Sequence, residues 1–410
     1  MKTQEMPKKD SALKPKAGRI AAMTGNNAVA EGMRQINPDV VAAYPITPQT
    51  EAVEEFAEFV ANGLVKTEYI PVESEHSSMS ACIGASAAGA RVMTATSSAG
   101  FALMWEMLPI AAGLRTPIVM YVANRAFSAP LNIHCSHDDT MGGRDTGWVQ
   151  IYSENAQEVY DNLIQAVRIA EDPAIQLPTM VCMDGFIISH SVERVELLDD
   201  EVVKKFVGEE YKRTYPLLNT DKPVTIGACA LPDYYTEHKR QHSEALLNAK
   251  PKILEVAREF EKISGRKYGL FESYQLDDAD YAIVIINSAA GVAKMVVDEL
   301  RAKGMKVGIL KPRIYRPFPV EEIRQALKKI KAIAVLDRVD AFGSGGTPTC
   351  TETKAALYGL EKPPLMINYV YGLGGRDISL ENISQVFKRL EKIARDGKVD
   401  KVFDYLTVRD

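Results

Sequence analysis

Polar side chains suited to binding an acid follow short apolar runs in the first half of the sequence. Thr47 stands directly before Pro48, where a helix can begin, and the free N–H groups of a helix N-terminus attract a carboxylate. Arg125 follows another apolar run and carries a planar fork of donors that suits a carboxylate or a carbonyl oxygen. Glu75 and the Ser97-Ser98 pair follow two further runs. The set predicts a polar site for an acid group.

Each of these residues also has a simpler structural interpretation. The Thr47 hydroxyl can act only as an N-cap, with Pro48 in the first helical position. Glu75 begins a stretch of small residues that reads as a helix, and a carboxylate in a first helical turn is commonplace. Arg125 can form a surface salt bridge. Taken one at a time, the residues favour these interpretations, so the functional prediction rests on their convergence.

Two other patterns suggest ligands but do not match a known ligand set. Residues 134–139 read His-Cys-Ser-His-Asp-Asp, which invites a metal site. No matching ligand set occurs elsewhere in the sequence, so a hydrogen-bonded polar loop is the favoured interpretation and no metal is predicted on this chain. The glycine-rich stretches 343–346 and 372–375 fit neither G-x-G-x-x-G nor a P-loop and predict tight turns.

The elements around these residues predict an α/β fold. Helical patterns alternate with β-branched runs, and the latter predict strands at residues 40–44, 65–70, 91–96, 117–123 and 179–183. Such alternation predicts a parallel sheet covered by helices on both faces. Ligands bind such sheets at the carboxyl ends of the strands, where the residues singled out above all fall. Residues 99–114 are predicted to form one buried helix.

The 410 residues exceed a typical single core and divide into a predicted series of segments. A basic N-terminal arm (1–17) precedes the first α/β domain (18–195). A charged connection (196–265), with a helix at 253–264, leads to a second α/β domain (266–395) and a C-terminal tail (396–410). The strands predicted in the second domain are 281–286, 306–310, 332–336 and 365–370.

Composition restricts the class of protein. The net charge of −5 provides no basic surface for nucleic acid, so no nucleic-acid partner is predicted. No apolar stretch approaches the length of a bilayer span, and no secretory signal is evident, which predicts a cytoplasmic protein without a membrane partner. The five cysteines are scattered, with none in C-x-x-C spacing, which excludes a local iron–sulfur motif on this chain.

Taken together, several segments resemble the alpha subunit of pyruvate and related 2-oxoacid:ferredoxin oxidoreductases. The matching segments are 43–50 (Ala-Tyr-Pro-Ile-Thr-Pro-Gln-Thr), 72–77 (Val-Glu-Ser-Glu-His-Ser), 124–126 (Asn-Arg-Ala), 144–148 (Arg-Asp-Thr-Gly-Trp) and 183–187 (Met-Asp-Gly-Phe-Ile). The resemblance extends from about residue 18 to about residue 394. It implies a pyrimidine-type thiamine-diphosphate-binding domain followed by a smaller domain like the C-terminal domain of transketolase.

The resemblance also implies roles for individual residues. Glu75 would contact N1′ of the cofactor's aminopyrimidine and promote its activation. Thr47 and Arg125 would bind the carboxylate and carbonyl of the 2-oxoacid, and Ser97 and Ser98 would line the same cavity. The sequence contains no Gly-Asp-Gly motif, so the magnesium that holds the diphosphate would belong to a beta subunit.

Further partners implied are gamma- and delta-type subunits with [4Fe-4S] clusters, ferredoxin as electron acceptor and coenzyme A as co-substrate. Pyruvate is the expected 2-oxoacid, and a branched-chain 2-oxoacid such as 2-oxoisovalerate is the alternative, because the two groups share these motifs. A non-catalytic scaffold subunit is a second alternative, opposed by the joint presence of Glu75, Thr47 and Arg125. A freestanding nucleotide-dependent dehydrogenase lacks its dinucleotide motif.

Overall fold

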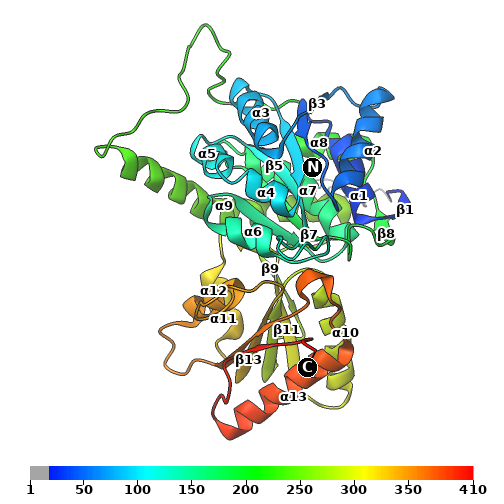
Figure 1. Cartoon of the computed structure of the whole chain (residues 1–410), viewed down its shortest axis with the longest axis vertical. Coiled ribbons are helices and arrows are strands. Elements are labelled where there is room, and N and C mark those ends of the chain that lie inside the picture. Colours follow the sequence, from blue (N-terminus) through cyan, green and yellow to red (C-terminus); the bar gives the residue numbers. More distant parts are fainter. Residues whose placement is uncertain (1–17, 410) are drawn as a thin grey trace, which may run out of the picture.

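The computed structural model describes residues 18–409, which form two α/β domains, and the long helix α9 (Tyr235–Ser264) of the connecting segment lies against the first of them (Figure 1). The predicted N-terminal arm, residues 1–17, lies outside the described residues. The α/β class with parallel sheets, predicted from the alternation of strand and helix patterns, is confirmed. Among residues 18–409, no helix combines the length and the apolar character needed to cross a membrane.

The first domain is built on a sheet that has seven strands within the described residues, in the order β12-β6-β7-β5-β4-β2-β3. Neighbouring strands are parallel, except that β12 is antiparallel to β6. The strands are β2 (Val40–Ala43), β3 (Glu68–Pro71), β4 (Val92–Thr96), β5 (Ile118–Asn124), β6 (Val149–Ser153), β7 (Thr179–Asp184) and β12 (Ile314–Arg316).

Helices cover both faces of this sheet because successive strand residues point to opposite sides. Along β5, Val119 and Tyr121 join one hydrophobic cluster, whereas Met120 and Val122 join the other. The first face is covered by α1 (Gly25–Ile36), α2 (Thr50–Ala61), α7 (Ala156–Glu171), α8 (Asp200–Val207) and part of α9 (Tyr235–Ser264). The second is covered by α3 (Glu75–Ala88), α4 (Ser98–Leu103), α5 (Met107–Gly113) and α6 (Asp138–Gly142).

The second domain has a six-stranded sheet in the described residues, in the order β15-β14-β13-β10-β11-β9. Only the pairing of β9 with β11 is antiparallel. Its elements are β9 (Phe271–Tyr274), β10 (Tyr281–Ile285), α10 (Ala289–Ala302), β11 (Val307–Pro312), α11 (Val320–Leu327), β13 (Ala332–Asp337), α12 (Pro348–Leu357), β14 (Leu365–Val370), α13 (Leu380–Asp396) and β15 (Phe403–Tyr405). The strand β15 lies in the predicted C-terminal tail.

The two domains are held together by contacts beyond the segment 196–265 that connects them. After β11, the chain crosses back and adds β12 to the edge of the first sheet. Within the first domain, a separate two-stranded sheet pairs β1 (Ile20–Met23) with β8 (Glu193–Glu196). Lys311 of β11 is buried and pairs with Glu154 and Glu158 of the first domain. These contacts fix the second domain against the first and so define what can lie between them.

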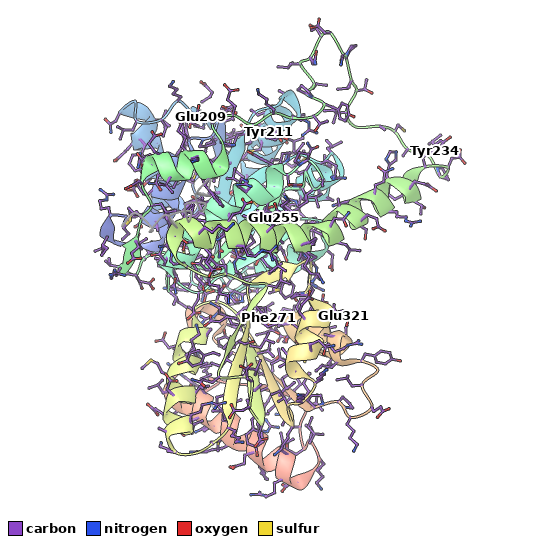
Figure 2. The ribbon with its side chains drawn as sticks, turned by 180° about the vertical axis from the view of Figure 1, so that it is seen from behind. Glu209, Tyr211, Tyr234, Glu255, Phe271 and Glu321 are labelled. Atoms are coloured by element: carbon purple, nitrogen blue, oxygen red, sulfur yellow. The ribbon has the colours of Figure 1, made fainter. Side chains whose placement is uncertain are left out.

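The predicted helix at 253–264 is the inner part of the much longer α9, which begins at Tyr235. The outer part was not predicted because its side chains are mostly exposed and its buried face is marked only by small residues such as Ala245 and Ala249. Figure 2 shows Glu255 on the part of α9 that lies against the first domain and Tyr234 at its projecting end. The loop 208–234 runs from the body of the domain to that end.

Two further expectations need correction. Residues 99–114 form two short helices, α4 and α5, instead of one. The chain turns between them, which brings Glu106 and Trp105 to the surface while Phe101 and Leu108 stay buried. The buried strand β6 was not predicted because Gln150 and Ser153 interrupt its apolar pattern.

Candidate functional site

The loops that follow β2, β3, β4 and β5 meet at one edge of the first sheet because these neighbouring strands are parallel. This edge carries Thr47, Glu75, the Ser97-Ser98 turn and Arg125. The convergence predicted from topology is therefore present in the structure, and hydrogen bonds join several of the loops. What each residue does there depends on its local contacts.

Glu75 is the first residue of α3, whose N-terminus is capped by the Ser74 hydroxyl accepting from the Ser77 N–H. Its side chain is only 5% exposed. Gly100 provides the space for it: a Cβ at that position would lie 2.5 Å from Oε1 of Glu75 and 2.6 Å from Oγ1 of Thr96. The Thr96 hydroxyl is buried and makes no hydrogen bond within residues 18–409. The carboxyl thus occupies a tight pocket beside an unpartnered hydroxyl.

Arg125 and Thr47 lie next to each other. Nη1 of Arg125 donates to the Thr47 carbonyl oxygen at 2.8 Å, and Nε donates to the Asn132 carbonyl oxygen at 3.2 Å. Burial lowers the pKa of Arg125, which the nearby Asp139 carboxylate opposes. The two hydrogen bonds direct the Arg125 side chain along the loop after β2. Among the described residues, its Nη2 makes no hydrogen bond, so the two N–H donors of that nitrogen remain for a ligand.

The N-cap interpretation of Thr47 is wrong. Helix α2 begins at Thr50, and the residue before it is Gln49, whose side chain does not cap the helix. Residues 47–49 form a turn instead, and the Thr47 side chain is exposed at the edge of the sheet. Gln49 is buried and donates to the Tyr44 carbonyl oxygen at 2.9 Å, which holds this loop in place. The Thr47 hydroxyl is consequently not committed to a helix end.

Ser97 and Ser98 are buried, but their hydroxyls serve the protein itself. The Ser97 hydroxyl donates to the Ala123 carbonyl oxygen at 2.7 Å, and the Ser98 hydroxyl donates to the Ala126 carbonyl oxygen at 2.6 Å. Both bonds join the turn after β4 to the strand and loop of β5. The pair therefore fixes the shape of the site, and a direct contact with a cofactor stays a prediction.

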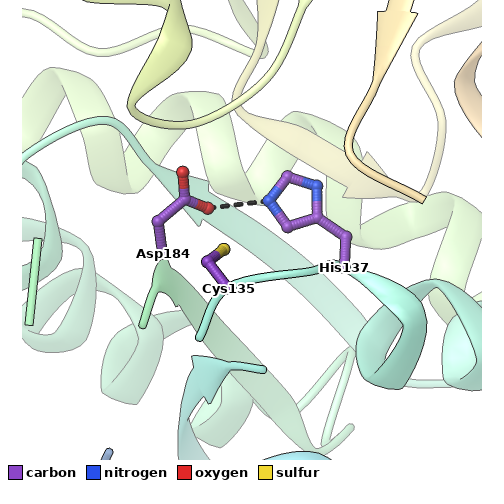
Figure 3. Close-up of side chains that lie close together, drawn as sticks. All are labelled: Cys135, His137 and Asp184. Atoms are coloured by element: carbon purple, nitrogen blue, oxygen red, sulfur yellow. Dashed lines mark hydrogen bonds and ion pairs between the residues drawn. The ribbon is translucent and has the colours of Figure 1, made fainter. Parts of the chain in front are cut away.

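The loop 134–139 divides between surface and interior. His134 is exposed, whereas Cys135 and His137 are buried together with Asp184 at the end of β7. Figure 3 shows these three side chains, with His137 Nε2 2.7 Å from Asp184 Oδ1. One ligand atom from each lies within 4.8 Å of the others, which is compatible in distance with a metal ion. Their surroundings decide against it.

The Asp184 carboxylate already has its counter-charge and its donors. The amide of Asn287 donates to Oδ1 at 2.8 Å, and the Ser288 hydroxyl donates to Oδ2. Arg338 lies 3.9 Å away, with its guanidinium 5.1 Å from the centre of the Tyr371 ring. Burial alone raises the pKa of Asp184, but Arg338 and His137 together lower it below its usual range. A metal cation would compete with Arg338, so the cluster is better described as a buried junction between the domains.

The glycine-rich stretches form tight turns, as predicted. Gly343 and Gly346 have positive φ values, and so do Gly372, Gly374 and Gly375. The second stretch contacts the first domain closely. The N–H of Gly375 donates to the Cys135 carbonyl oxygen at 2.7 Å, and a Cβ there would lie 2.5 Å from the Cβ of His134. This stretch therefore helps to close the two domains together.

The edge of the first sheet fits one end of thiamine diphosphate and not the other. A buried carboxyl beside the unpartnered hydroxyl of Thr96 suits the polar edge of an aminopyrimidine. A diphosphate with magnesium needs a separate set of oxygen ligands. The sequence lacks the Gly-Asp-Gly motif for that end, as noted above. The residues at this edge thus suit the pyrimidine half of such a site, and their contact with it stays a prediction.

Comparison with known families supports this description. The model of the thiamine-diphosphate-binding domain of pyruvate flavodoxin/ferredoxin oxidoreductases matches residues 31–258. The model of core domain II of pyruvate:ferredoxin oxidoreductase matches residues 279–383. The two matches cover both α/β domains.

Similar curated proteins include pyruvate synthase subunit PorA of Thermotoga maritima, which is 56% identical over 90% of this chain and 93% of its own length. PorA of Methanocaldococcus jannaschii is 48% identical, covering 92% of this chain and 96% of the relative. Ketoisovalerate oxidoreductase subunit VorA of Pyrococcus horikoshii is 44% identical, covering 93% and 96%.

Two solved structures share the fold. A chain of the 2-oxoglutarate:ferredoxin oxidoreductase from Magnetococcus marinus aligns with a TM-score of 0.70 at 21% identity, over 92% of this chain and 65% of that chain. The chain described here thus spans slightly less than two thirds of that matched chain. A split-gene transketolase aligns with a TM-score of 0.54 at 11% identity, over 92% of this chain and all of the transketolase chain.

Proposed function

Because the chain belongs to the pyruvate flavodoxin/ferredoxin oxidoreductase family, we propose that it is the alpha subunit of a pyruvate:ferredoxin oxidoreductase, or pyruvate synthase. The assembled enzyme converts pyruvate and coenzyme A to acetyl-CoA and carbon dioxide, and passes the electrons to ferredoxin. The observation that carries the proposal is the 56% identity to a pyruvate synthase subunit over nearly the full length of both chains.

The residues of the sheet edge take complementary roles in this proposal. Bound thiamine diphosphate supplies a nucleophilic carbon for attack on the 2-oxo group. Glu75 holds or moves a proton at the aminopyrimidine nitrogen, in a pocket whose space depends on Gly100. The Nη2 donor of Arg125 and the exposed hydroxyl of Thr47 hold the carboxylate and carbonyl of the substrate. Ser97 and Ser98 keep the loops of the cavity in place.

The remaining parts of the enzyme belong to partner chains. A beta-type subunit supplies magnesium and the diphosphate half of the site, and gamma- and delta-type subunits complete the cytoplasmic complex. The [4Fe-4S] clusters lie on these partners, because this chain has no closely spaced cysteines. Four of the five cysteines are buried and separate from one another in sequence, which supports that assignment.

A branched-chain 2-oxoacid is the second candidate substrate, favoured by the 44% identity to a ketoisovalerate oxidoreductase subunit. A difference of one or two methylene groups in an apolar pocket changes specificity by only about 1–3 kcal/mol, so few side chains need to differ. A scaffold without activity is disfavoured by the buried pocket of Glu75 and by the hydrogen-bonded placement of Arg125.

The substrate is tested by the rate of viologen reduction by the anaerobically purified complex. Pyruvate, 2-oxoisovalerate and 2-oxoglutarate are compared at matched concentrations, with and without coenzyme A. A coenzyme-A-dependent rate that is highest with pyruvate supports the proposal. A preference for 2-oxoisovalerate keeps the mechanism and changes the substrate. No reduction with any of the three, by a complex that retains thiamine diphosphate and its clusters, contradicts the proposed function.

The role of Glu75 is tested by Glu75→Gln, which keeps the shape of the side chain and removes its acidity. We expect kcat to fall by about 10²- to 10⁴-fold, the usual contribution of a positioned acid–base group. Glu73→Gln is the matched control, because Glu73 is exposed two residues earlier in the same loop and, among the described side chains, bonds to the Ser77 hydroxyl alone. Its rate should stay within about twofold of the parent. Full turnover by Glu75→Gln would refute the assigned role.

A further inference from the structure

Asp139 is a fully buried carboxylate beneath the candidate site, in the short helix α6. Its oxygens accept four hydrogen bonds from three segments. Oδ2 accepts from the backbone N–H groups of Ser98 and Arg125, both at 3.0 Å. Oδ1 accepts from the Asn124 side-chain amide at 2.8 Å and from the Thr140 N–H at 2.7 Å. A single side chain thus joins the turn after β4, the end of β5 and α6.

The donors to Asp139 are all neutral groups, and no ion pair within residues 18–409 includes this carboxylate. The Arg125 guanidinium lies nearby but bonds to the Thr47 and Asn132 carbonyl oxygens, so the buried charge stays costly, and burial raises the pKa of Asp139 to about 6. Four hydrogen bonds offset part of that cost. An uncharged side chain could fill this space without that cost. We therefore infer that the role of the Asp139 carboxylate is to hold together the segments that donate to it.

On one side, Asp139 holds the turn that supports Glu75. Ser98 has a φ of 44°, in the left-handed region that is strained for a residue with a side chain. Its N–H bond to Asp139 and its hydroxyl bond to Ala126 stabilise that conformation. The turn begins α4 and places Gly100 beside the carboxyl of Glu75. Movement of the turn would therefore change the space around that carboxyl.

On the other side, Asp139 holds Arg125 through its backbone. The N–H bond at 3.0 Å fixes the start of the side chain, and the bonds to the Thr47 and Asn132 carbonyl oxygens fix its guanidinium. Asn124, the residue before Arg125, is held to the same carboxylate by its side-chain amide. This amide also donates to Thr140 Oγ1 at 2.7 Å. The arginine is therefore constrained at both ends.

We propose that Asp139 is a positioning residue that sets the Glu75 pocket and the Arg125 guanidinium in a fixed relation to each other. It does not touch the substrate; it acts through the backbone of Ser98 and Arg125. The inference rests on the proposed function, since a fixed relation between these two groups matters for a reaction that needs both. The sequence predicted a hydrogen-bonded polar segment at 134–139 but did not identify Ser98 and Arg125 as the partners of Asp139.

The test is Asp139→Asn in the complete complex. The amide keeps one acceptor oxygen and introduces a donor that faces two other donors, so part of the network must open. We expect kcat/KM for pyruvate to fall about tenfold, mainly through a higher KM, corresponding to the loss of about one hydrogen bond. Hydrogen exchange should quicken in peptides that contain the amides of Ser98 and Arg125.

Asp161→Asn is the matched control. Asp161 is also fully buried in the first domain, where it accepts from Arg266 and Tyr268 away from the site. This variant should lose stability while the KM for pyruvate and the exchange of the Ser98 and Arg125 peptides remain those of the parent. An unchanged KM and unchanged exchange in Asp139→Asn would overturn the proposal. So would an equal rise in KM in Asp161→Asn.

A second variant covers the case in which Asp139→Asn does not assemble. Asn124→Ala removes the amide that holds Oδ1 of Asp139 and also bonds to Thr140 Oγ1, so the carboxylate can turn and its bonds to Ser98 and Arg125 weaken. We expect a rise in KM of about threefold, smaller than for Asp139→Asn, with faster exchange at the end of β5. No change in either quantity would overturn the proposal. If the parent complex reduces no 2-oxoacid, the proposed function fails, whereas the exchange measurements still report on the network itself.

Discussion

Asp139 and Asp184 are both fully buried aspartates near the same edge of the first sheet, yet their surroundings differ in charge. In the described part of the chain, Asp139 accepts only from neutral groups of its own domain. Asp184 lies between His137 and Arg338 and accepts from Asn287 and Ser288 of the second domain. The difference indicates that one carboxylate arranges loops within a domain, whereas the other joins two domains as part of a charged network.

The comparison predicts the largest difference when each carboxylate is removed. Asp184→Ala leaves the guanidinium of Arg338 buried without its counter-charge, so we expect a loss of about 3–5 kcal/mol in the free energy of unfolding. Asp139→Ala leaves neutral donors unpaired and relieves a costly buried charge, so we expect a loss of about 1–3 kcal/mol. Urea unfolding of the purified variants measures both. Equal losses would remove the distinction between the two sites.

The two carboxylates also predict opposite responses to pH. The pKa of Asp139 in the folded chain is raised to about 6, above the ordinary 3.8. Its contribution to stability is therefore greatest below pH 3.8 and is lost as the pH rises through 6, by about 3 kcal/mol for about two pKa units. The pKa of Asp184 is lowered, so its contribution is present above pH 3.8 and is lost only as the pH falls below that value.

The measurement is the difference in unfolding free energy between the parent and each Asp→Asn variant, followed across pH. For Asp139→Asn, the parent should become less stable relative to the variant between pH 4 and 7. For Asp184→Asn, that difference should stay flat over this range. A flat profile for Asp139→Asn would mean that its carboxylate is better stabilised than its neutral partners suggest.

The positions of Asp139 and Asp184 could be predicted in part from the sequence. The strands ending near Asn124 and Asp184 were recognisable from their apolar patterns, and so was the convergence of Glu75 and Arg125 on one edge. The partners of the two aspartates were not. Asp139 bonds to an N–H that is 41 residues away, and Asp184 to an amide that is 103 residues away. Such pairings depend on tertiary packing, which local periodicity does not report.

The same limit explains the other differences between the prediction and the structure. Strand β12 joins a sheet whose other strands lie far earlier in the chain, and nothing in Ile314–Arg316 indicates which sheet it enters. The outer part of α9 is mostly exposed, and only small residues such as Ala245 and Ala249 mark its buried face. Thr47 was read as an N-cap from its proline neighbour, but the helix starts three residues later. In each case the deciding contact comes from another part of the fold.

The smallest predicted effect concerns the glycine contact beside the domain junction. Gly375 has a φ of 80°, and a Cβ there would lie 2.5 Å from the Cβ of His134. Gly397 has a φ of 69° with no atom within 4 Å of such a Cβ. Alanine at either position adopts a left-handed conformation that costs about 1 kcal/mol. Only Gly375→Ala also meets the opposite domain, which we expect to add about 1 kcal/mol because the exposed His134 loop can shift.

The melting temperatures of the two alanine variants measure this difference, with pyruvate-dependent activity as a second reading. Gly375→Ala should melt below Gly397→Ala, and its loss should shrink when the contact is relieved by His134→Gly in the same chain. Equal melting temperatures would mean that the second domain yields at this contact. The junction would then depend mainly on Asp184 and Arg338, because close packing of the glycine turn would contribute little to holding the domains together.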